Sequence, residues 1–249
     1  MPSFGAHPGV TDSSKSVYHL WQGFSVAAVI IGALAIGLIL YAVLRYRRRS
    51  SDAIPAQHQY HLPLEILYTV VPILVVFGLF AATLVVENKE TANPQTNVTV
   101  DVNAFQWGWQ FTYPGTNALV YGQTTQSPEM VMPVDTNVHF NLTSTDVVHG
   151  FYVRAFNFSR YALPGVVNQF TIRATSTGTF FGQCTQLCGL YHSLMYFRVK
   201  VVTPAQYAQW LATFNNAADA AKAAAATKTT NEELASGVAS KNTTTKFGR

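Results

Sequence analysis

The residues from Phe24 to Leu44 form an unbroken run of 21 positions without a charged side chain. A helix of that length, rising about 1.5 Å per residue, crosses a hydrocarbon core of roughly 30 Å. Trp21 precedes the run and Tyr41 lies near its other end, where aromatic rings favour the membrane interface. A secretory signal peptide would begin with basic residues and carry a shorter apolar run. We therefore interpret this segment as a membrane span in contact with lipid.

A second apolar run extends from Leu64 to Val86, and the segment between the two runs carries four arginines within Arg45–Arg49. Basic residues in short loops mark the cytoplasmic side of a membrane. The chain is therefore expected to begin outside with residues 1–19, to cross the membrane as a helical hairpin over residues 20–90, and to return outside. The expected location is a bacterial plasma membrane.

Short runs that alternate in hydrophobicity or are rich in β-branched residues replace the long apolar runs after the hairpin. Four of them are Val98–Val102, Val138–Leu142, Gln169–Ile172 and Tyr196–Val202. Prolines and glycines supply turns between these runs, so residues 91–203 are predicted to form a β-sandwich or barrel. The remaining segment, 204–249, is predicted to form an Ala-rich helix from Pro204 to about Ala226 and then a flexible, solvated tail.

The composition excludes several classes of protein. Charged residues make up 11% of the chain, against roughly 25% in ordinary soluble proteins, and the net charge is +4. Because the bases form no long stripe, no nucleic-acid partner is expected. Two cysteines, Cys184 and Cys188, are too few for a scaffold held by disulfides. The absence of a Cys-x-x-Cys-His motif excludes covalently attached haem c.

The sharpest chemical signal is the segment that places Cys184, Cys188, His192 and Met195 within 12 residues. Thiolate, imidazole and thioether ligands are soft or borderline, and they suit copper far better than magnesium or calcium. A blue-copper site uses one Cys, two His and a weak axial Met, so the second Cys is surplus to such a site. A simple use for it is to bind a second copper, with both sulfurs shared between the two metals.

Such a centre needs one more histidine, and the candidate is His149, which lies shortly after the predicted strand at Val138. The backbone carbonyl of Gln186, between the cysteines, is a further candidate ligand. A disulfide between Cys184 and Cys188 is an alternative outside the cytoplasm, but it leaves the spacing of the His and Met unexplained. A zinc site is another alternative, for which Met is a poor ligand.

These residues give the chain a resemblance to subunit II of the haem–copper cytochrome c oxidases, whose binuclear CuA site has the pattern Cys-x-x-x-Cys-x-x-x-His-x-x-Met. The resemblance covers about residues 20–205. It includes the stretches Gly182–Cys184, Cys188–Ser193, Asp146–His149, Ala162–Gly165 and the aromatic strand Gln106–Tyr113. It implies a membrane-anchored all-β protein, in which a two-helix transmembrane hairpin precedes a cupredoxin-like β-sandwich and a C-terminal helix and tail.

The resemblance also implies the roles of individual residues. The implied copper ligands are His149, Cys184, the carbonyl of Gln186, Cys188, His192 and Met195. Trp107 would be the surface point where electrons from cytochrome c enter. The alternative is that Trp107 and Trp109 both pack in the core, because residues two apart on a regular strand share one face.

Glu65 is the other candidate for a functional role. The family carries the pattern Glu-x-x-Trp-Thr-x-x-Pro at the cytoplasmic mouth of a proton pathway into subunit I. This chain has the same spacing from Glu65 to Pro72, with Tyr68 in place of Trp. A carboxylate at the mouth of a span is usually functional or interfacial. The alternative is a solvated glutamate at a helix start, where the helix dipole favours it.

Two departures from the family pattern bear on cofactors and partners. The family usually has Glu between the cysteines, and its carboxylate also ligates a Mg²⁺ shared with subunit I. Gln186 offers no carboxylate, which places that Mg²⁺ in doubt. Between Gln95 and Lys200 the chain has four acids and five bases, too few acids for the patch that commonly attracts a basic, soluble cytochrome c. We therefore hypothesise a donor cytochrome that is tethered or held in a larger complex.

The implied function is that of an electron-accepting subunit of a terminal cytochrome c oxidase. It would take electrons from cytochrome c at CuA and pass them to haem in subunit I, where oxygen is reduced to water and protons are pumped. A CuA domain like that of nitrous-oxide reductase is disfavoured by the hairpin and Glu65, and a quinol-oxidase subunit would lack Cys184 and Cys188. A membrane-held copper carrier, or a structural subunit with a disulfide, remains an alternative from another class.

Overall fold

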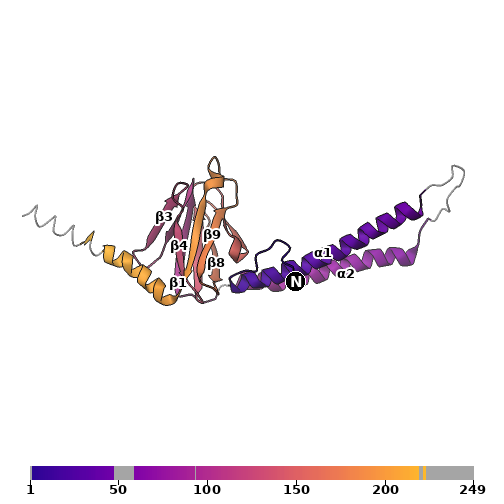
Figure 1. Ribbon diagram of the computed structural model, residues 1–249, viewed down its shortest axis with the longest axis horizontal. Coiled ribbons are helices and arrows are strands. Elements are labelled where there is room, and N and C mark those ends of the chain that lie inside the picture. The colour runs from indigo at the N-terminus through magenta and orange to yellow at the C-terminus, as the bar shows by residue number, and fades with distance from the viewer. Residues whose placement is uncertain (1, 48–58, 93, 219–220, 223–249) are drawn as a thin grey trace, which may run out of the picture.

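The computed structural model describes residues 2–47, 59–92, 94–218 and 221–222. Within these residues two long helices lie side by side, a β-sandwich follows them, and a further helix extends from the far end of the sandwich (Figure 1). This arrangement confirms the predicted membrane-anchored all-β fold.

The two helices are the predicted spans, extended at their ends by polar turns. Helix α1 covers Asp12–Arg45, and Thr11 caps it by accepting a hydrogen bond from the Ser14 N–H at 3.0 Å. Helix α2 covers Leu62–Glu90. Their most apolar windows have mean hydropathies of 2.7 and 2.6, and none of either window is buried inside the structure. Both helices are long and apolar enough to cross a membrane, and their uncovered side chains fit contact with lipid. Of the predicted cytoplasmic arginines, Arg48 and Arg49 lie outside the described residues.

The sandwich consists of two five-stranded sheets, with strand orders β3-β2-β1-β5-β8 and β4-β10-β9-β6-β7. The strands are β1 Val98–Phe105, β2 Gly108–Thr112, β3 Leu119–Gln123, β4 Glu129–Pro133, β5 Asn137–Ser144, β6 His149–Val153, β7 Phe158–Ala162, β8 Asn168–Arg173, β9 Gly178–Cys184 and β10 Tyr196–Val202. Each sheet includes one parallel pair, β1 with β5 and β4 with β10, and the other pairs are antiparallel. The four runs identified from the sequence correspond to β1, β5, β8 and β10.

Aromatic rings from both sheets fill the space between them. Trp109 and Phe111 on β2 meet Phe197 on β10, with ring centroids 5.0 Å and 5.7 Å apart. Phe151 on β6 stacks on Phe197 at 4.8 Å. Full burial of these rings removes a large apolar area from water, which makes the core the main stabilising element beneath the copper motif.

The segment before α1 joins the hairpin to the sandwich. The Val10 N–H donates to the Ala155 carbonyl at 3.0 Å, and the Thr175 N–H donates to the Val10 carbonyl at 2.8 Å. Beside these bonds, Arg173 on β8 forms an ion pair with Asp12 at 3.1 Å. The outer end of α1 is therefore held directly against the sandwich.

The C-terminal helix is present at residues 204–218 and 221–222. Trp210 packs edge-on against Tyr113 beyond β2, with centroids 4.9 Å apart. The predicted continuation to Ala226 and the flexible tail lie outside the described residues.

Candidate metal centre

Two strand ends and the loop between them bring the predicted ligands together. His149 opens β6, Cys184 closes β9, and Met195 directly precedes β10. The antiparallel pairing of β9 with β10 brings the two ends of the loop to one place, where the Cys184 N–H donates to the Met195 carbonyl at 3.0 Å. Pairing of β6 with β9 sets Phe151 opposite Cys184, which places His149 beside the loop.

The potential ligand atoms lie in one small cluster. The Sγ atoms of Cys184 and Cys188 are 3.8 Å apart, well beyond the roughly 2.05 Å of a disulfide bond. His149 Nδ1 lies 3.9 Å from the Cys184 sulfur. The remaining contacts are His192 Nδ1 to Cys188 Sγ at 3.6 Å, Met195 Sδ to Cys188 Sγ at 3.8 Å, and the Gln186 carbonyl to Cys184 Sγ at 3.3 Å. All six predicted ligands therefore converge.

The orientation of the His149 ring is set by Asp146, three residues earlier. His149 Nε2 lies 2.9 Å from the Asp146 carboxylate, which also accepts hydrogen bonds from the backbone N–H groups of Gln106 and Val147 at 2.6 Å each. With the proton on Nε2, the lone pair of Nδ1 faces the cysteines. Asp146 therefore acts on the candidate site as a positioning residue, a role that was not predicted from the sequence, although its position three residues before His149 could have indicated one.

The surroundings of the two thiols shift their pKa values in opposite directions. Burial alone would raise the pKa of Cys184, but hydrogen bonds with His149 and from the Gly150 N–H lower it to about 6. Burial raises the pKa of Cys188 to about 12, and the neighbouring Cys184 thiolate adds to that rise. Burial likewise opposes the charged form of His149, yet its hydrogen bonds with Cys184 and Asp146 raise its pKa above the usual value. The cluster therefore holds one thiolate readily and resists a second negative charge.

Trp107 lies in the turn between β1 and β2, not on a regular strand with Trp109. The suggestion that the two rings share one face is therefore wrong: Trp109 is fully buried beneath His149, whereas Trp107 is half-buried at the surface. The Trp107 indole N–H donates to the Cys188 carbonyl at 3.1 Å, and the Gln106 amide donates to the same oxygen at 2.7 Å. The Gln106 contact could not be anticipated from the sequence, because the two residues are 82 positions apart.

Glu65 is not part of this cluster, because it lies in the first turn of α2. Its carboxylate accepts a hydrogen bond from the His61 N–H at 2.8 Å. A glutamate at this position satisfies a free N–H at the helix start and interacts favourably with the helix dipole. The structure therefore gives Glu65 a helix-capping contact.

The donor set fits copper. Two sulfurs 3.8 Å apart can share an ion, because metal–thiolate bonds are about 2.3 Å long. Thioether, imidazole and thiolate together form the ligand set of a soft, redox-active metal. The fold and the cluster thus define a membrane-anchored cupredoxin-like domain with a candidate copper site.

Comparison with known proteins identifies the family. The sequence profile described as "Cytochrome C oxidase subunit II, periplasmic domain" matches residues 116–202. The probable cytochrome c oxidase subunit 2 of Streptomyces avermitilis is 35% identical, in an alignment covering 84% of this chain and 78% of the relative. Cytochrome c oxidase subunit 2 of Corynebacterium diphtheriae is 31% identical, with 84% and 75% covered. The chain belongs to the cytochrome c oxidase subunit 2 family, and it is the electron-accepting subunit of an oxidoreductase complex.

Two solved structures of relatives each cover about half of this chain. The periplasmic domain of subunit II (CoxB) of Bradyrhizobium japonicum is 31% identical, with a TM-score of 0.45, over 49% of this chain and 96% of that one. The same kind of domain, in a mixed disulfide intermediate with the thioredoxin-like TlpA, is 29% identical with a TM-score of 0.43, over 50% and 95%.

The opposite pKa shifts of the two thiols predict that they ionise in two well-separated steps when the chain holds no copper. One thiolate should form with a midpoint near pH 6 and be lost as the pH falls through that value, while the second thiol should stay protonated to about pH 12. The pH dependence of alkylation at each cysteine, followed by mass spectrometry, measures both steps, because only the thiolate reacts. His149→Asn should move the first midpoint upward, because the thiolate loses its ring partner, whereas His139→Asn, on the outer face of β5, should not. Two thiolates forming together near the ordinary value of about pH 8.5 would contradict this assignment.

Proposed function

We propose that the chain accepts electrons one at a time from a c-type cytochrome at a binuclear copper centre, CuA, and delivers them to haem in subunit I of the oxidase. Oxygen reduction and proton pumping belong to that other subunit. The observation that carries the proposal is the convergence of six donor groups, two of them cysteine sulfurs 3.8 Å apart. A single-copper carrier would have no use for both sulfurs together with two histidines and a methionine.

The side chains of this chain hold the donors in place before any metal arrives. The proposed ligands are His149, Cys184, the Gln186 carbonyl, Cys188, His192 and Met195. Copper bound by them would supply a one-electron redox couple. His149, both cysteines and Met195 are buried on the aromatic core, which keeps water away and restricts movement of the ligands. A rigid, dry ligand cage keeps the structural change on electron transfer small, which favours fast transfer.

Trp107 is the proposed point where electrons enter. Its ring is half-buried at the surface, and its N–H reaches the backbone carbonyl of Cys188, a proposed ligand. Tyr191 packs edge-on against the indole with centroids 5.0 Å apart, and so holds the ring in position. The path from the surface to a ligand therefore needs one hydrogen bond and the backbone of a single residue.

The charge of the sandwich supports a donor that is tethered or bound in a larger complex. Its acids are only four: Asp101, Glu129, Asp135 and Asp146. Glu129 is paired with Lys200 at 3.2 Å, and Asp135 is within 3.4 Å of Arg173. The field that would steer a basic, soluble cytochrome is therefore weak.

Family membership also supports our proposals for the membrane topology and for the roles of Glu65 and Gln186. We place the sandwich, residues 91–203, and the segment 1–19 on the extracytoplasmic side of a bacterial plasma membrane, with the hairpin at 20–90 beside the other oxidase subunits. Glu65 is proposed as the mouth of a proton pathway. A Mg²⁺ site shared with subunit I would use a carboxylate, whereas the side chain of Gln186 is an amide. We therefore assign Gln186 only the role of a copper ligand, through its backbone carbonyl.

Trp107→Phe tests the proposed route of the electron. The variant should keep its copper, because Gln106 still holds the Cys188 carbonyl, but reduction of the copper by reduced cytochrome c should slow markedly. Stopped-flow absorbance measures the rate, and metal analysis measures the copper content. Trp210→Phe, at the opposite end of the domain, should leave the rate unchanged. Equal rates for the wild type and Trp107→Phe would refute the assignment.

The weak acidic field predicts that oxidase turnover with the natural donor depends little on salt. Raising the ionic strength from roughly 0.01 to 0.15 M shortens the Debye length from about 30 to 8 Å. Where steering dominates, association rates are raised about 10- to 10³-fold and fall steeply over such a range. Here the change in turnover should stay below about tenfold. A steep fall would show that a freely diffusing, charge-steered donor is used instead.

A further inference from the structure

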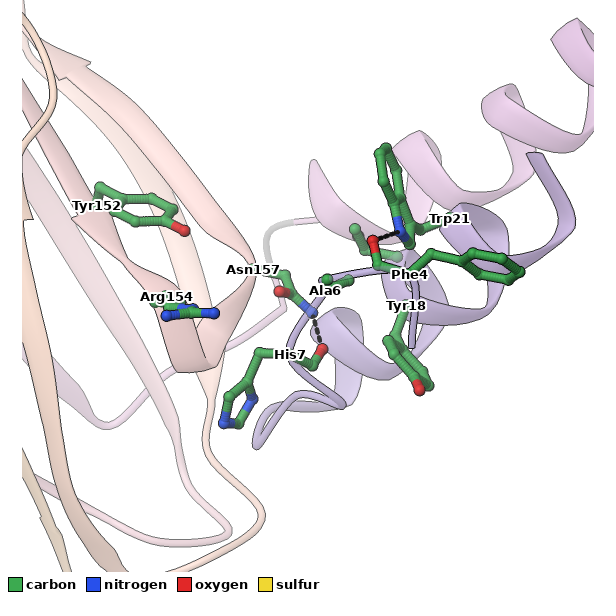
Figure 2. A pocket seen from close by; sticks show the side chains of 10 residues that line it. Phe4, Ala6, His7, Tyr18, Trp21, Tyr152, Arg154 and Asn157 are labelled. Carbon is green, nitrogen blue, oxygen red and sulfur yellow. Dashed lines mark hydrogen bonds between the residues drawn. The ribbon is translucent and has the colours of Figure 1, made fainter. Parts of the chain in front are cut away.

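A cavity of about 390 Å³ lies where the sandwich meets the outer end of α1. Figure 2 shows Tyr152 and Arg154, carried by β6 and the 3₁₀ turn η1 (Arg154–Phe156), on one side of it, with Tyr18 and Trp21 of α1 on the other. The cavity is separate from the candidate copper site, because none of the proposed copper ligands lines it.

The cavity lies at the depth of lipid headgroups. Trp21 is three positions before the uncharged run that begins at Phe24, and Tyr18 is one helical turn further out. The headgroup layer adds roughly 5 to 8 Å on each side of the hydrocarbon core, which corresponds to a few helical residues. Phe4 and Trp21 are 38% and 49% exposed, so they present apolar surface at the level where aromatic rings favour the interface.

The charge of the cavity is unbalanced. The guanidinium of Arg154 makes no hydrogen bond or ion pair with any residue that the structure describes, and no Asp or Glu is among the lining residues. His7 contributes an imidazole ring to the lining. Two neighbouring cavities at the same junction differ, because one contains Asp12 and the other contains Glu87 and Glu90. This cavity therefore favours an anion, whereas its neighbours balance their own cations.

The walls of the cavity are held by hydrogen bonds rather than formed by a loose loop. The Asn157 amide donates to the His7 carbonyl at 2.9 Å, and the Trp21 indole N–H donates to the Phe4 carbonyl at 3.3 Å (Figure 2). The Asn157 amide also donates to the Ser14 carbonyl at 3.3 Å. These contacts fasten the N-terminal segment over α1 and beneath the sandwich. A site built in this way loses little conformational freedom when a ligand binds.

We propose that this cavity binds the phosphate of an anionic membrane phospholipid, with Arg154 as its charge partner and the lipid chains lying along the apolar surface of α1. An unpaired arginine, aromatic walls at headgroup depth and an uncovered apolar helix are the three elements that such a lipid requires. The bound lipid would fix the sandwich relative to the membrane surface. The inference rests on the membrane anchor and not on the copper site, so it can fail or hold independently of the proposed electron transfer.

The test titrates the full-length chain, copper-loaded in a neutral detergent, with short-chain phosphatidylglycerol or phosphatidylcholine, and counts bound lipids by native mass spectrometry. The wild type should hold one phosphatidylglycerol about fivefold more tightly than phosphatidylcholine, the preference expected for a single basic side chain near a membrane surface. Arg154→Gln should abolish the preference. Arg154→Lys should keep most of it, because the phosphate still meets a positive charge.

Arg173→Gln is the matched control, because that arginine lies at the same junction but is already paired with Asp12 and Asp135. It should leave the preference intact, and an unchanged circular dichroism spectrum shows that each variant is folded. Equal affinity of the wild type for the two lipids, or equal losses in Arg154→Gln and Arg173→Gln, would overturn the proposal. Displacement of phosphatidylglycerol by inorganic phosphate at similar concentration would also overturn it, by showing that the site takes a soluble anion.

Discussion

The candidate site depends on the antiparallel pairing of β9 with β10. That pairing closes the loop from Cys184 to Met195, and the 3.0 Å hydrogen bond between the backbones of these two residues joins its ends. Beneath the loop, Phe197 on β10 stacks on Phe151 of β6. The same strand therefore anchors the loop and the core, and β6 carries His149 to the loop from its other side. If this pairing were lost, the donors would separate.

Negative charges on the two cysteine sulfurs would repel each other, and a bound metal cation would offset that repulsion. Burial and the neighbouring Cys184 thiolate raise the pKa of Cys188 to about 12, whereas hydrogen bonds with His149 and from the Gly150 N–H lower that of Cys184 to about 6, so the two sulfurs do not both ionise easily. A thiolate-binding cation supplies the missing positive charge. Metal ligation would also keep the two sulfurs from forming a disulfide outside the cytoplasm.

The parts of the fold with a strong periodic signal were predictable from sequence. The boundaries of β10 were predicted to the residue, and the apolar core of each span was found, although both helices continue beyond it through capped polar turns. Strands such as β4, which includes Pro133 and is almost wholly buried, show no alternation and gave no signal. The candidate ligands from Cys184 to Met195 could be proposed because their spacing is local, whereas His149 lies 35 positions before Cys184 and was proposed as the histidine that this set lacked. The Gln106 contact with Cys188 joins residues 82 positions apart and was not accessible from the sequence. The turn position of Trp107 follows from the local pairing of Phe105 with Gly108, which the run of aromatic residues from Gln106 to Tyr113 did not reveal.

The most direct test of the account combines copper analysis with electron paramagnetic resonance of the copper-loaded chain. The account predicts two coppers per chain that share one unpaired electron. One copper with a mononuclear signal would contradict it and would favour a carrier or a blue-copper protein. No copper, with Cys184 and Cys188 joined as a disulfide, would contradict electron transfer by this chain altogether.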